Sequence, residues 1–372
     1  MADVKALLAE FDEISKNPRK MLDSYLAAGE KVIGSFYYTP QPLITALGMI
    51  PMGLWGGQVN PQVAGKYAPI FTCSILRSSL EFGMTGAYEG LSAVLMPILC
   101  DTFRGTCAAW RAGVNIKLIP FVHPQNRKDP GALDYLIEEY KYVKTELENV
   151  AGKTCTDADI HAAIDLHNKK NKVIRDFCAA ANHHLDLITA VTRHHVMKAL
   201  TFMKPEDIIE KLSQLTAALN ELPDYEWTGK KVILTGITAE PDDMLAGFTA
   251  NNIAVVGDDL MQESRLYRTD YPAANSAMES LALQWLNIKG CSMAHDDNSR
   301  ARGEHLVSMV EENGADAVVL CMMRFCDTEE YDQPYIIKMV QDAGYMAFSI
   351  DIDQSTSDSG QALTKIQAFA EN

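Results

Sequence analysis

Cys73 and Cys100 stand at matching points of two consecutive units of the sequence, where their thiolates could bind a metal. An apolar run precedes each cysteine, at residues 69–72 and 93–99, and a helical pattern of apolar residues follows each of them. We therefore expect both cysteines to end a strand and to open a helix. In a parallel sheet these positions share the edge at which ligands bind, and a helix N-terminus lowers the pKa of a thiol.

Cys326 has the same predicted placement, because it lies just past a strand expected at residues 316–321. Two other cysteines compete with these three as metal ligands. Cys107 lies two turns beyond Cys100 and Cys321 ends an apolar run, so we predict that both are core residues. The remaining cysteines have no partner pattern: Cys155, Cys178 and Cys291. For any single cysteine of such a chain, a small buried hydrophobic side chain is the simplest interpretation.

The elements that must position these cysteines follow an alternating strand and helix pattern. Strands are expected at residues 31–38, 49–54, 93–99 and 116–121, and again at 230–235, 253–256, 316–321 and 345–350. The sequence therefore predicts an α/β fold with two Rossmann-like, doubly wound domains built on parallel sheets.

The first of these domains, with the N-terminal helices, is expected over residues 1–150 and the second over 226–372. A helical segment at 151–225 separates them, with a capping box at Thr156 and Asp159. The stretch PDYEWTG at residues 223–229 is the predicted linker, and the strand at 253–256 should end in the loop GDD.

Composition excludes several classes of function. The formal charge of −16 over 372 residues argues against nucleic-acid binding, which needs basic surface. No apolar run approaches the roughly 20 residues that cross a bilayer, and the N-terminus has no secretion signal, so we expect a cytoplasmic protein without membrane contact. Neither a GxGxxG motif nor a P-loop follows the opening strands, which disfavours nicotinamide enzymes and P-loop NTPases.

Histidines crowd the helical segment in two pairs, at residues 183–184 and 194–195. On one helix His184 and His195 would be about 16 Å apart, at 1.5 Å per residue, which is too far for shared metal coordination. We expect these histidines to be solvated or satisfied by neighbours. The basic cluster over residues 169–175 is interpreted as a solvated helix face.

Three features of the chain are specific in combination. They are the opening YYTPQPLITALGMIP at residues 37–51, the pattern C-S-x-x-R-S at 73–78 followed by P-x-x-C-D at 97–101, and F-C-D at 325–327. By these features the chain resembles the 2-hydroxyacyl-CoA dehydratase family, which also includes the benzoyl-CoA reductase subunits. The resemblance extends over nearly the whole length.

This resemblance implies a cofactor and its ligands. In the family each of two homologous subunits holds a 4Fe-4S cluster through three cysteines, and those positions fall here on Cys73, Cys100 and Cys326. Clusters demand thiolates, and three ligands leave one iron open to water, sulfide or substrate. The spacing is unlike ferredoxin C-x-x-C runs, so the pattern alone does not indicate a cluster.

The resemblance also implies a reaction. The family removes water from a (2R)-hydroxyacyl-CoA thioester to give an (E)-2-enoyl-CoA in anaerobic amino-acid fermentation. One electron injected through the cluster makes a ketyl radical anion, hydroxide leaves, the proton on carbon 3 becomes acidic, and the electron is recycled. A separate ATP-hydrolysing iron-sulfur activator protein supplies that electron, which accounts for the absence of a P-loop here.

The chain departs from the family at Gln41 and Pro42, where a Pro-Glu pair is usual, so a carboxylate near the expected active cleft is missing. This departure favours the smaller, electron-relaying subunit of a heterodimer, with substrate mainly on the longer homologous alpha subunit. Ser35, at a strand end, could hydrogen-bond a substrate or a cluster ligand, and capping is an equally good interpretation.

Two alternatives stay open at this stage. One is a subunit of a benzoyl-CoA-reductase-type enzyme, in which the same cluster passes electrons into an aromatic ring. The other is a metal-free α/β binding protein with buried cysteines. The sequence assigns no catalytic base.

Overall fold

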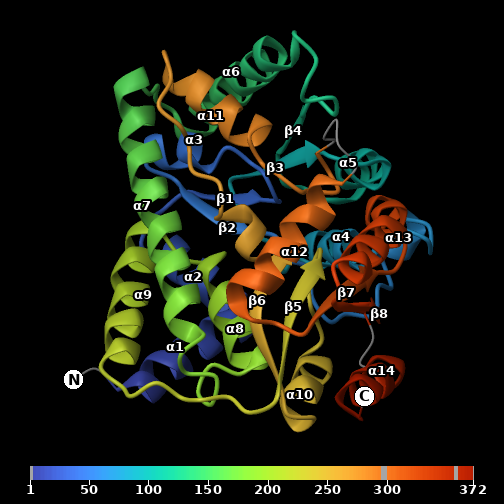
Figure 1. Cartoon of the computed structure of the whole chain (residues 1–372). Helices are drawn as coiled ribbons and strands as arrows, with labels where there is room; N and C mark the ends of the chain where they lie inside the picture. Colours follow the sequence, from blue (N-terminus) through green and yellow to red (C-terminus); the bar gives the residue numbers. More distant parts are fainter. Residues whose placement is uncertain (1–2, 295–299, 356–358, 372) are drawn as a thin grey trace.

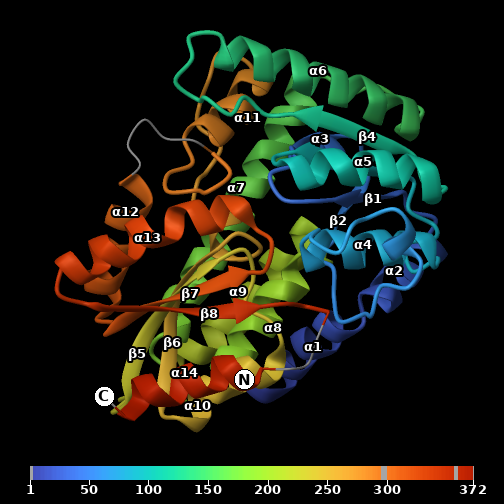
Figure 2. The same ribbon diagram turned by 90° about the vertical axis from the view of Figure 1, so that its right-hand side faces the viewer.

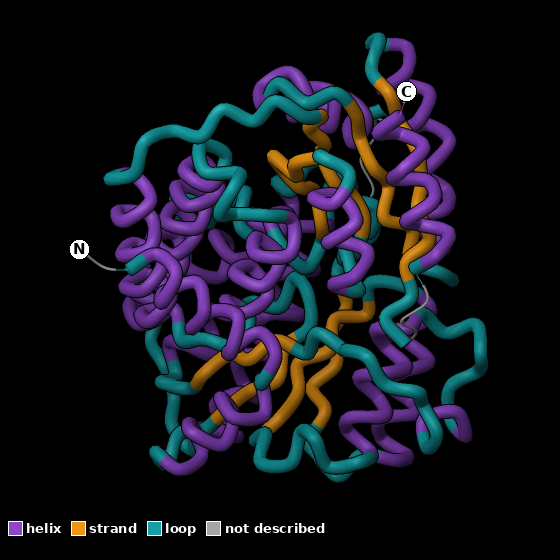
Figure 3. Tube along the Cα trace, turned by 90° about the horizontal axis from the view of Figure 1, so that it is seen from below, coloured by secondary structure: helices purple, strands orange, loops and turns teal. Residues whose placement is uncertain are grey.

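The computed structural model describes residues 3–294, 300–355 and 359–371, and these form two four-stranded parallel sheets flanked by helices (Figure 1). The strands lie in two separate groups when the molecule is seen from below (Figure 3). This confirms the α/β class and the two parallel, Rossmann-like sheets. None of the helices in the described part of the chain combines the length and the apolarity needed to cross a lipid bilayer.

The first sheet has the strand order β2-β1-β3-β4. Its strands are β1 Val32–Ser35, β2 Ile50–Gly53, β3 Ala93–Ile98 and β4 Leu118–Val122. The helices of this part are α1 Val4–Lys16, α2 Pro18–Ala27, α3 Gln41–Ala46, α4 Ser74–Met84, α5 Asp101–Gly113 and α6 Ala132–Ala151, and a short 3-10 helix, η1, spans Ala64–Lys66. β3 is a central strand, and its apolar run is buried as expected of a strand covered on both faces.

The second sheet repeats that order as β6-β5-β7-β8. Its strands are β5 Lys230–Gly236, β6 Ile253–Leu260, β7 Ala317–Met323 and β8 Met346–Ile352. Its helices are α10 Asp242–Ala250, α11 Ala277–Leu286, α12 Ala301–Asn313, α13 Asp327–Asp342 and α14 Gly360–Glu371, with a short 3-10 helix, η2, at Ser264–Leu266. α10 and α14 lie on one side of this sheet and α12 and α13 on the other (Figure 2).

Because the two sheets share one strand order, Cys100 and Cys326 are structural counterparts. Each follows the third strand of its sheet, β3 or β7, and each precedes a helix, α5 or α13. The two halves share this topology and a Cys-Asp pair, at residues 100–101 and 326–327.

The helices α7 Asp157–Ala181, α8 Ala190–Leu200 and α9 Pro205–Asn220 lie between the two sheets along the chain. α7 begins with the predicted capping box of Thr156 and Asp159. α7 packs on α3 and α9, whereas α8 packs on α1 and α10, so these helices contact both halves. The division at residues 150 and 225 stays a prediction.

The two halves are joined by more than the helical segment. α11 belongs to the second half in sequence, yet it packs against α6 and α7 (Figure 1). The buried Arg127 donates from the first half to the carbonyls of Trp285 and Leu286 at the end of α11, at 3.2 Å each. One large core cluster contains buried residues of both sheets, such as Ile33 of β1 and Val232 of β5.

The strand expected at residues 69–72 is wrong. These residues form turns in the loop that leads from β2 to α4, and Ile70 and Phe71 are exposed. A buried strand would hide such side chains, so local apolarity misled the prediction. The Glu81 carboxylate on α4 stabilises the loop by accepting hydrogen bonds from the backbone N–H groups of Val63 and Ala64 at 2.9 and 2.7 Å.

Two further expectations were wrong: the loop expected at GDD, and the solvated helix face for one member of the basic cluster, Lys170, although Lys169 and Lys172 are exposed as expected. Asp258 and Asp259 do not follow β6 but lie inside it, buried, where Arg193 and Arg265 pair with them at 3.2 and 2.8 Å. Lys170 does not lie on a solvated face. It is buried on α7, 3.4 Å from the Gln41 side-chain oxygen, and burial lowers the pKa of Lys170 to about 7.

Candidate functional site

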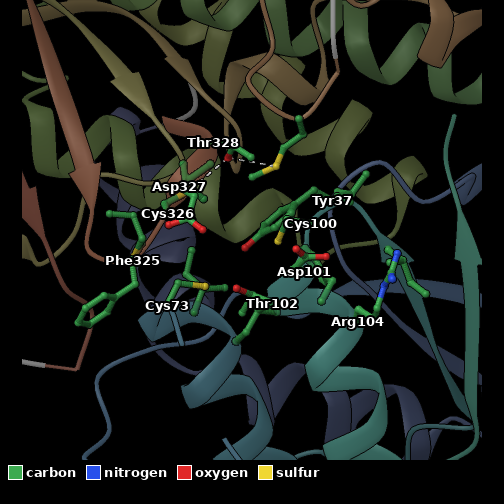
Figure 4. A pocket seen from close by; sticks show the side chains of 18 of the residues that line it. Tyr37, Cys73, Cys100, Asp101, Thr102, Arg104, Phe325, Cys326, Asp327 and Thr328 are labelled. Atoms are coloured by element: carbon green, nitrogen blue, oxygen red, sulfur yellow. Dashed lines mark hydrogen bonds between the residues drawn. The ribbon is translucent and has the colours of Figure 1, made fainter. Parts of the chain in front are cut away.

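Cys73, Cys100 and Cys326 line one cavity of about 520 Å³ between the two halves of the molecule (Figure 4). Cys73 and Cys100 come from the first half and Cys326 comes from the second. The structure thus brings together three residues that lie far apart in the sequence. The placement predicted for Cys100 and Cys326, just past a strand, is confirmed, whereas Cys73 follows a loop.

All three cysteines are the N-cap residues of helices: Cys73 of α4, Cys100 of α5 and Cys326 of α13. The positive ends of three helix dipoles therefore meet at one cavity. Backbone N–H groups of each first turn approach the sulfur and favour its thiolate, although none forms a capping hydrogen bond with it. The Thr328 hydroxyl is a further neighbour, 3.5 Å from the Cys326 sulfur.

Burial nevertheless outweighs the helix termini. It raises the pKa of Cys73 to about 12 and also raises the pKa values of Cys100 and Cys326. The first-turn N–H groups lower these pKa values, as expected of helix N-termini, but desolvation of the thiolate is the larger effect and the net change is upward. A metal cation between the sulfurs would reverse this balance by supplying positive charge and displacing the protons.

Tyr37 is the neighbour that the three sulfurs share. Its side chain extends into the space between the cysteines (Figure 4), and each of the three sulfurs acts electrostatically on its hydroxyl. Burial raises the pKa of Tyr37 well above its usual range, so the hydroxyl stays protonated. The Gln262 amide donates to the Tyr37 oxygen at 3.5 Å, which leaves the phenolic proton free to point into the cavity.

The motif residues around the cysteines fix the cavity walls. The Ser74 hydroxyl donates to the Met323 sulfur at 3.0 Å and accepts the Gln354 backbone N–H at 3.1 Å, so it ties α4 to the second sheet. Asp101 and Asp327, the first residues of α5 and α13, also line the cavity. Asp101, Asp327, Ser74 and Tyr37 all lie in the three motifs of the sequence, but the contacts of Ser74 and Tyr37 at this site were not predicted.

The other cysteines lie outside the lining of this cavity. The Cys107 thiol packs 3.2 Å from the Met96 sulfur, and Cys321 is fully buried in β7. Cys291 is 3.0 Å from the Tyr38 hydroxyl. The prediction that Cys107 and Cys321 are core residues is confirmed.

Ser35 and Gln41 lie near the site but line a different, much smaller cavity of about 30 Å³, which shares Tyr37 with the first. The Ser35 hydroxyl donates to the Met52 carbonyl and accepts from the Gln41 amide, at 3.5 Å each. Pro40 is the N-cap residue of the helix that follows, so Ser35 does not cap it.

The paired histidines of α8 are satisfied by carboxylates, as the sequence indicated. His194 lies between Glu263 at 2.7 Å and Glu240 at 3.1 Å. His195 lies between Asp12 at 2.6 Å and Asp242 at 2.9 Å.

Within the described residues no group of three or more cysteine, histidine or acidic side chains converges closely enough to hold a single metal ion. The three cysteines fit a different kind of centre. A polynuclear cluster carries each thiolate on a separate iron, so its ligands surround a volume and need not meet at a point. Three thiols around one cavity match that requirement, and Asp101 and Asp327 line the same cavity beside them.

Comparison with known proteins places these observations in a wider group. The family described as 2-hydroxyglutaryl-CoA dehydratase, D-component, matches residues 36–372. The chain is 36% identical to the lactoyl-CoA dehydratase subunit beta of Anaerotignum propionicum, over the full length of both. It is 37% identical to the (R)-phenyllactyl-CoA dehydratase beta subunit of Clostridium sporogenes, again over both full lengths. A benzoyl-CoA reductase subunit of Thauera aromatica is 25% identical over 80% of this chain and 79% of its own length.

Proposed function

This chain belongs to the 2-hydroxyglutaryl-CoA dehydratase D-component family, and from that premise we propose that it is the beta subunit of a cytoplasmic 2-hydroxyacyl-CoA dehydratase. The enzyme is a hydro-lyase that acts as a complex with a second subunit. Its reaction converts a 2-hydroxyacyl-CoA into a 2-enoyl-CoA and one water molecule, as in anaerobic amino-acid fermentation.

In this proposal Cys73, Cys100 and Cys326 hold one 4Fe-4S cluster. The observation that carries it is that three separate helix N-cap residues, from both halves of the chain, surround one cavity. The first-turn N–H groups direct partial positive charge toward the sulfurs, which favours the electron-rich state of a cluster, and the Tyr37 hydroxyl is close enough to interact electrostatically with all three sulfurs.

When bound, the cluster supplies one-electron transfer. One electron on the substrate thioester would make a ketyl radical anion, from which the hydroxyl group would leave as hydroxide so that the proton on carbon 3 could be removed. Return of the electron after this proton loss would leave the loss of water as the net change. An ATP-hydrolysing iron-sulfur activator protein supplies the first electron from outside the complex.

We further propose that this subunit relays the electron and that substrate binds mainly on the longer homologous subunit. Gln41, which stands where the family usually has part of a Pro-Glu pair, supports this assignment. Gln41 contacts Ser35 and Lys170, brings no carboxylate and does not line the three-cysteine cavity. The base for the carbon 3 proton is therefore not supplied at this position.

Two competing functions make different predictions. A benzoyl-CoA-reductase-type subunit would give a cyclic diene instead of an enoyl-CoA, and the lower identity to such a subunit makes it the weaker candidate. A metal-free binding protein would be colourless after anaerobic purification and would contain neither iron nor acid-labile sulfide.

Serine substitutions test the ligand assignment. We expect C73S, C100S and C326S each to lose most of the iron and sulfide of the anaerobically purified protein, because a serine hydroxyl is a poor replacement for a thiolate ligand. The matched controls are C107S and C321S, which replace buried cysteines outside the cavity and should keep the wild-type iron content. Loss of the cluster in C321S together with its retention in C326S would show that the assignment is wrong.

A further inference from the structure

Large apolar side chains stand exposed around the mouth of the three-cysteine cavity. Tyr331 is 79% exposed, Ile70 77%, Phe71 65% and Tyr335 61%, and these are the four most exposed large hydrophobic side chains of the described residues. We call the group the apolar rim, with these members: Tyr67, Ile70, Phe71, Phe325, Tyr331 and Tyr335. Soluble proteins seldom gather such side chains at one place unless a partner covers them.

The rim is continuous with the candidate site. Phe325 and Tyr331 line the three-cysteine cavity, and Phe325 also lines an adjoining cavity of about 360 Å³ together with Tyr67 and Phe71. Phe325 directly precedes Cys326, and its ring points away from the sulfurs (Figure 4). The segments that lead into Cys73 and Cys326 thus also contain rim residues, namely Ile70, Phe71 and Phe325.

The rim is built and held by the fold. The Arg77 guanidinium donates to the Ile70 carbonyl at 3.4 Å, and the Thr72 backbone N–H donates to the Pro69 carbonyl at 3.0 Å. Phe325 has a φ of +65°, a conformation that bulky residues avoid unless their surroundings impose it. Tyr331 and Tyr335 are one turn apart on the same face of α13.

We propose that the apolar rim is the docking surface for the longer homologous subunit. This inference rests on the proposed function, which requires two proteins to approach the cluster: that permanent subunit and the transient activator. Weak redox encounters bury little surface, whereas permanent complexes bury more than about 2,000 Å² and are more hydrophobic, and the buried centre of an interface is enriched in aromatic residues. Five of the six rim residues are aromatic, the class enriched at the buried centre of an interface, so the permanent partner fits better.

The proposal is tested by placing a charge at the rim while the longer subunit is co-expressed. Ile70→Glu and Tyr331→Glu should each weaken the heterodimer about 30-fold or more in Kd, the loss expected at a central interface residue. Tyr135→Glu and Tyr142→Glu are the matched controls on α6, at 44% and 45% exposure, and should leave the Kd unchanged. The Kd is measured by sedimentation velocity under anaerobic conditions.

Iron and sulfide content, measured on the same samples, separates this inference from the proposed function. Rim variants that lose the heterodimer but keep wild-type iron support the rim assignment. Wild-type protein without iron would refute the cluster. The rim proposal would still hold in that case if the rim variants lost the longer subunit and the control variants kept it.

Two results would overturn the proposal. In the first, the rim variants bind the longer subunit normally but are no longer reduced by activator and ATP, which would make the rim the activator's surface. In the second, the rim variants abolish only a self-association of this chain and leave the heterodimer intact, which would make the occupant a second copy.

Discussion

The hydroxyl of Tyr37 and the three thiols around it form the smallest unit on which the proposed electron transfer depends. Burial keeps all four groups protonated in the absence of metal, and Gln262 orients the phenol so that its proton is free to face the sulfurs. A hydrogen-bond donor at this place stabilises extra negative charge, and a reduced cluster carries more of it than an oxidised one.

Removing that donor should therefore change the reduction potential. We expect Tyr37→Phe to lower the potential by about 20–60 mV, the equivalent for one electron of a hydrogen bond that contributes about 0.5–1.5 kcal/mol. A redox titration followed by electron paramagnetic resonance measures the shift. Tyr38→Phe is the matched control, because the Tyr38 hydroxyl contacts Cys291 outside the cavity lining and its removal should leave the potential unchanged. Equal shifts in both variants would refute a specific role for Tyr37.

Among single residues, the sequence predicted where Cys100 and Cys326 lie in the fold, but it did not predict the neighbours of the three thiols. Cys100 and Cys326 could be predicted because apolar strand patterns precede them, and the family motifs pointed to Cys73 as well. Tyr37 could not be singled out, since a tyrosine after a buried strand is usually a core residue. Lys170 was misplaced because its burial depends on α3, which is far away in the sequence.

Among the elements, α8 is attached to the second sheet by buried ionic contacts. Burial alone would lower the pKa of His194, but hydrogen bonds and charges from Glu240 and Glu263 outweigh it and raise that pKa from 6.5 to about 9. The imidazolium is thus part of the contact between α8 and the loops that follow β5 and β6. Lys198 also pairs with Glu240, so one carboxylate has two cationic partners.

This arrangement predicts a pH dependence with a definite sign. Because the folded pKa of His194 lies above the unfolded value, its contribution to the free energy of unfolding is complete below pH 6.5 and is lost as the pH rises through 9. His194→Gln should therefore destabilise the protein by about 3 kcal/mol more at pH 6 than at pH 9.5. Urea unfolding of the wild type and of His194→Gln at the two pH values gives this difference. The lowered pKa of Lys170 makes stability change with pH in the opposite direction, but Lys170 is present in both proteins, so its effect cancels.

His183→Gln provides the control, because the His183 side chain is 60% exposed and pairs only with Asp224, itself exposed. It should leave the free energy of unfolding nearly unchanged at both pH values. A loss of stability in His194→Gln that is the same at pH 6 and pH 9.5 would contradict a charged His194.

Most strands and helices could be predicted from hydrophobic periodicity, and the misplaced ones have specific causes. The apolar stretch at residues 69–72 is exposed because it belongs to the rim and not to the core. The GDD residues remain inside β6 because Arg193 and Arg265, supplied by α8 and η2, neutralise Asp258 and Asp259. Arg193 lies 65 residues from Asp258, and such a distant pairing leaves no local pattern from which to predict it.

For the molecule as a whole, the proposed relay role predicts dependence on the partner. This chain with activator, ATP and reductant should not dehydrate a 2-hydroxyacyl-CoA, because Gln41 stands where the family pattern has a carboxylate and the proposed substrate site is on the longer subunit. Titration with the longer subunit should restore turnover until the two are equimolar, as followed by formation of the enoyl-CoA. Full turnover by this chain alone would refute the relay and would move the substrate site to the cleft near Ser35 and Cys73.

Cys73 and Cys100 belong to the first half of the chain and Cys326 to the second, so the site can form only when both halves are present. Protein synthesis proceeds from the N-terminus, so a nascent chain presents Cys73 and Cys100 long before Cys326, which appears only after the helical segment and β7. Until the second sheet has folded against the first, two thiols face an incomplete cavity. The proposed cluster, held by all three cysteines, could therefore be completed only after β7 and Cys326 have been made and the second sheet has folded against the first.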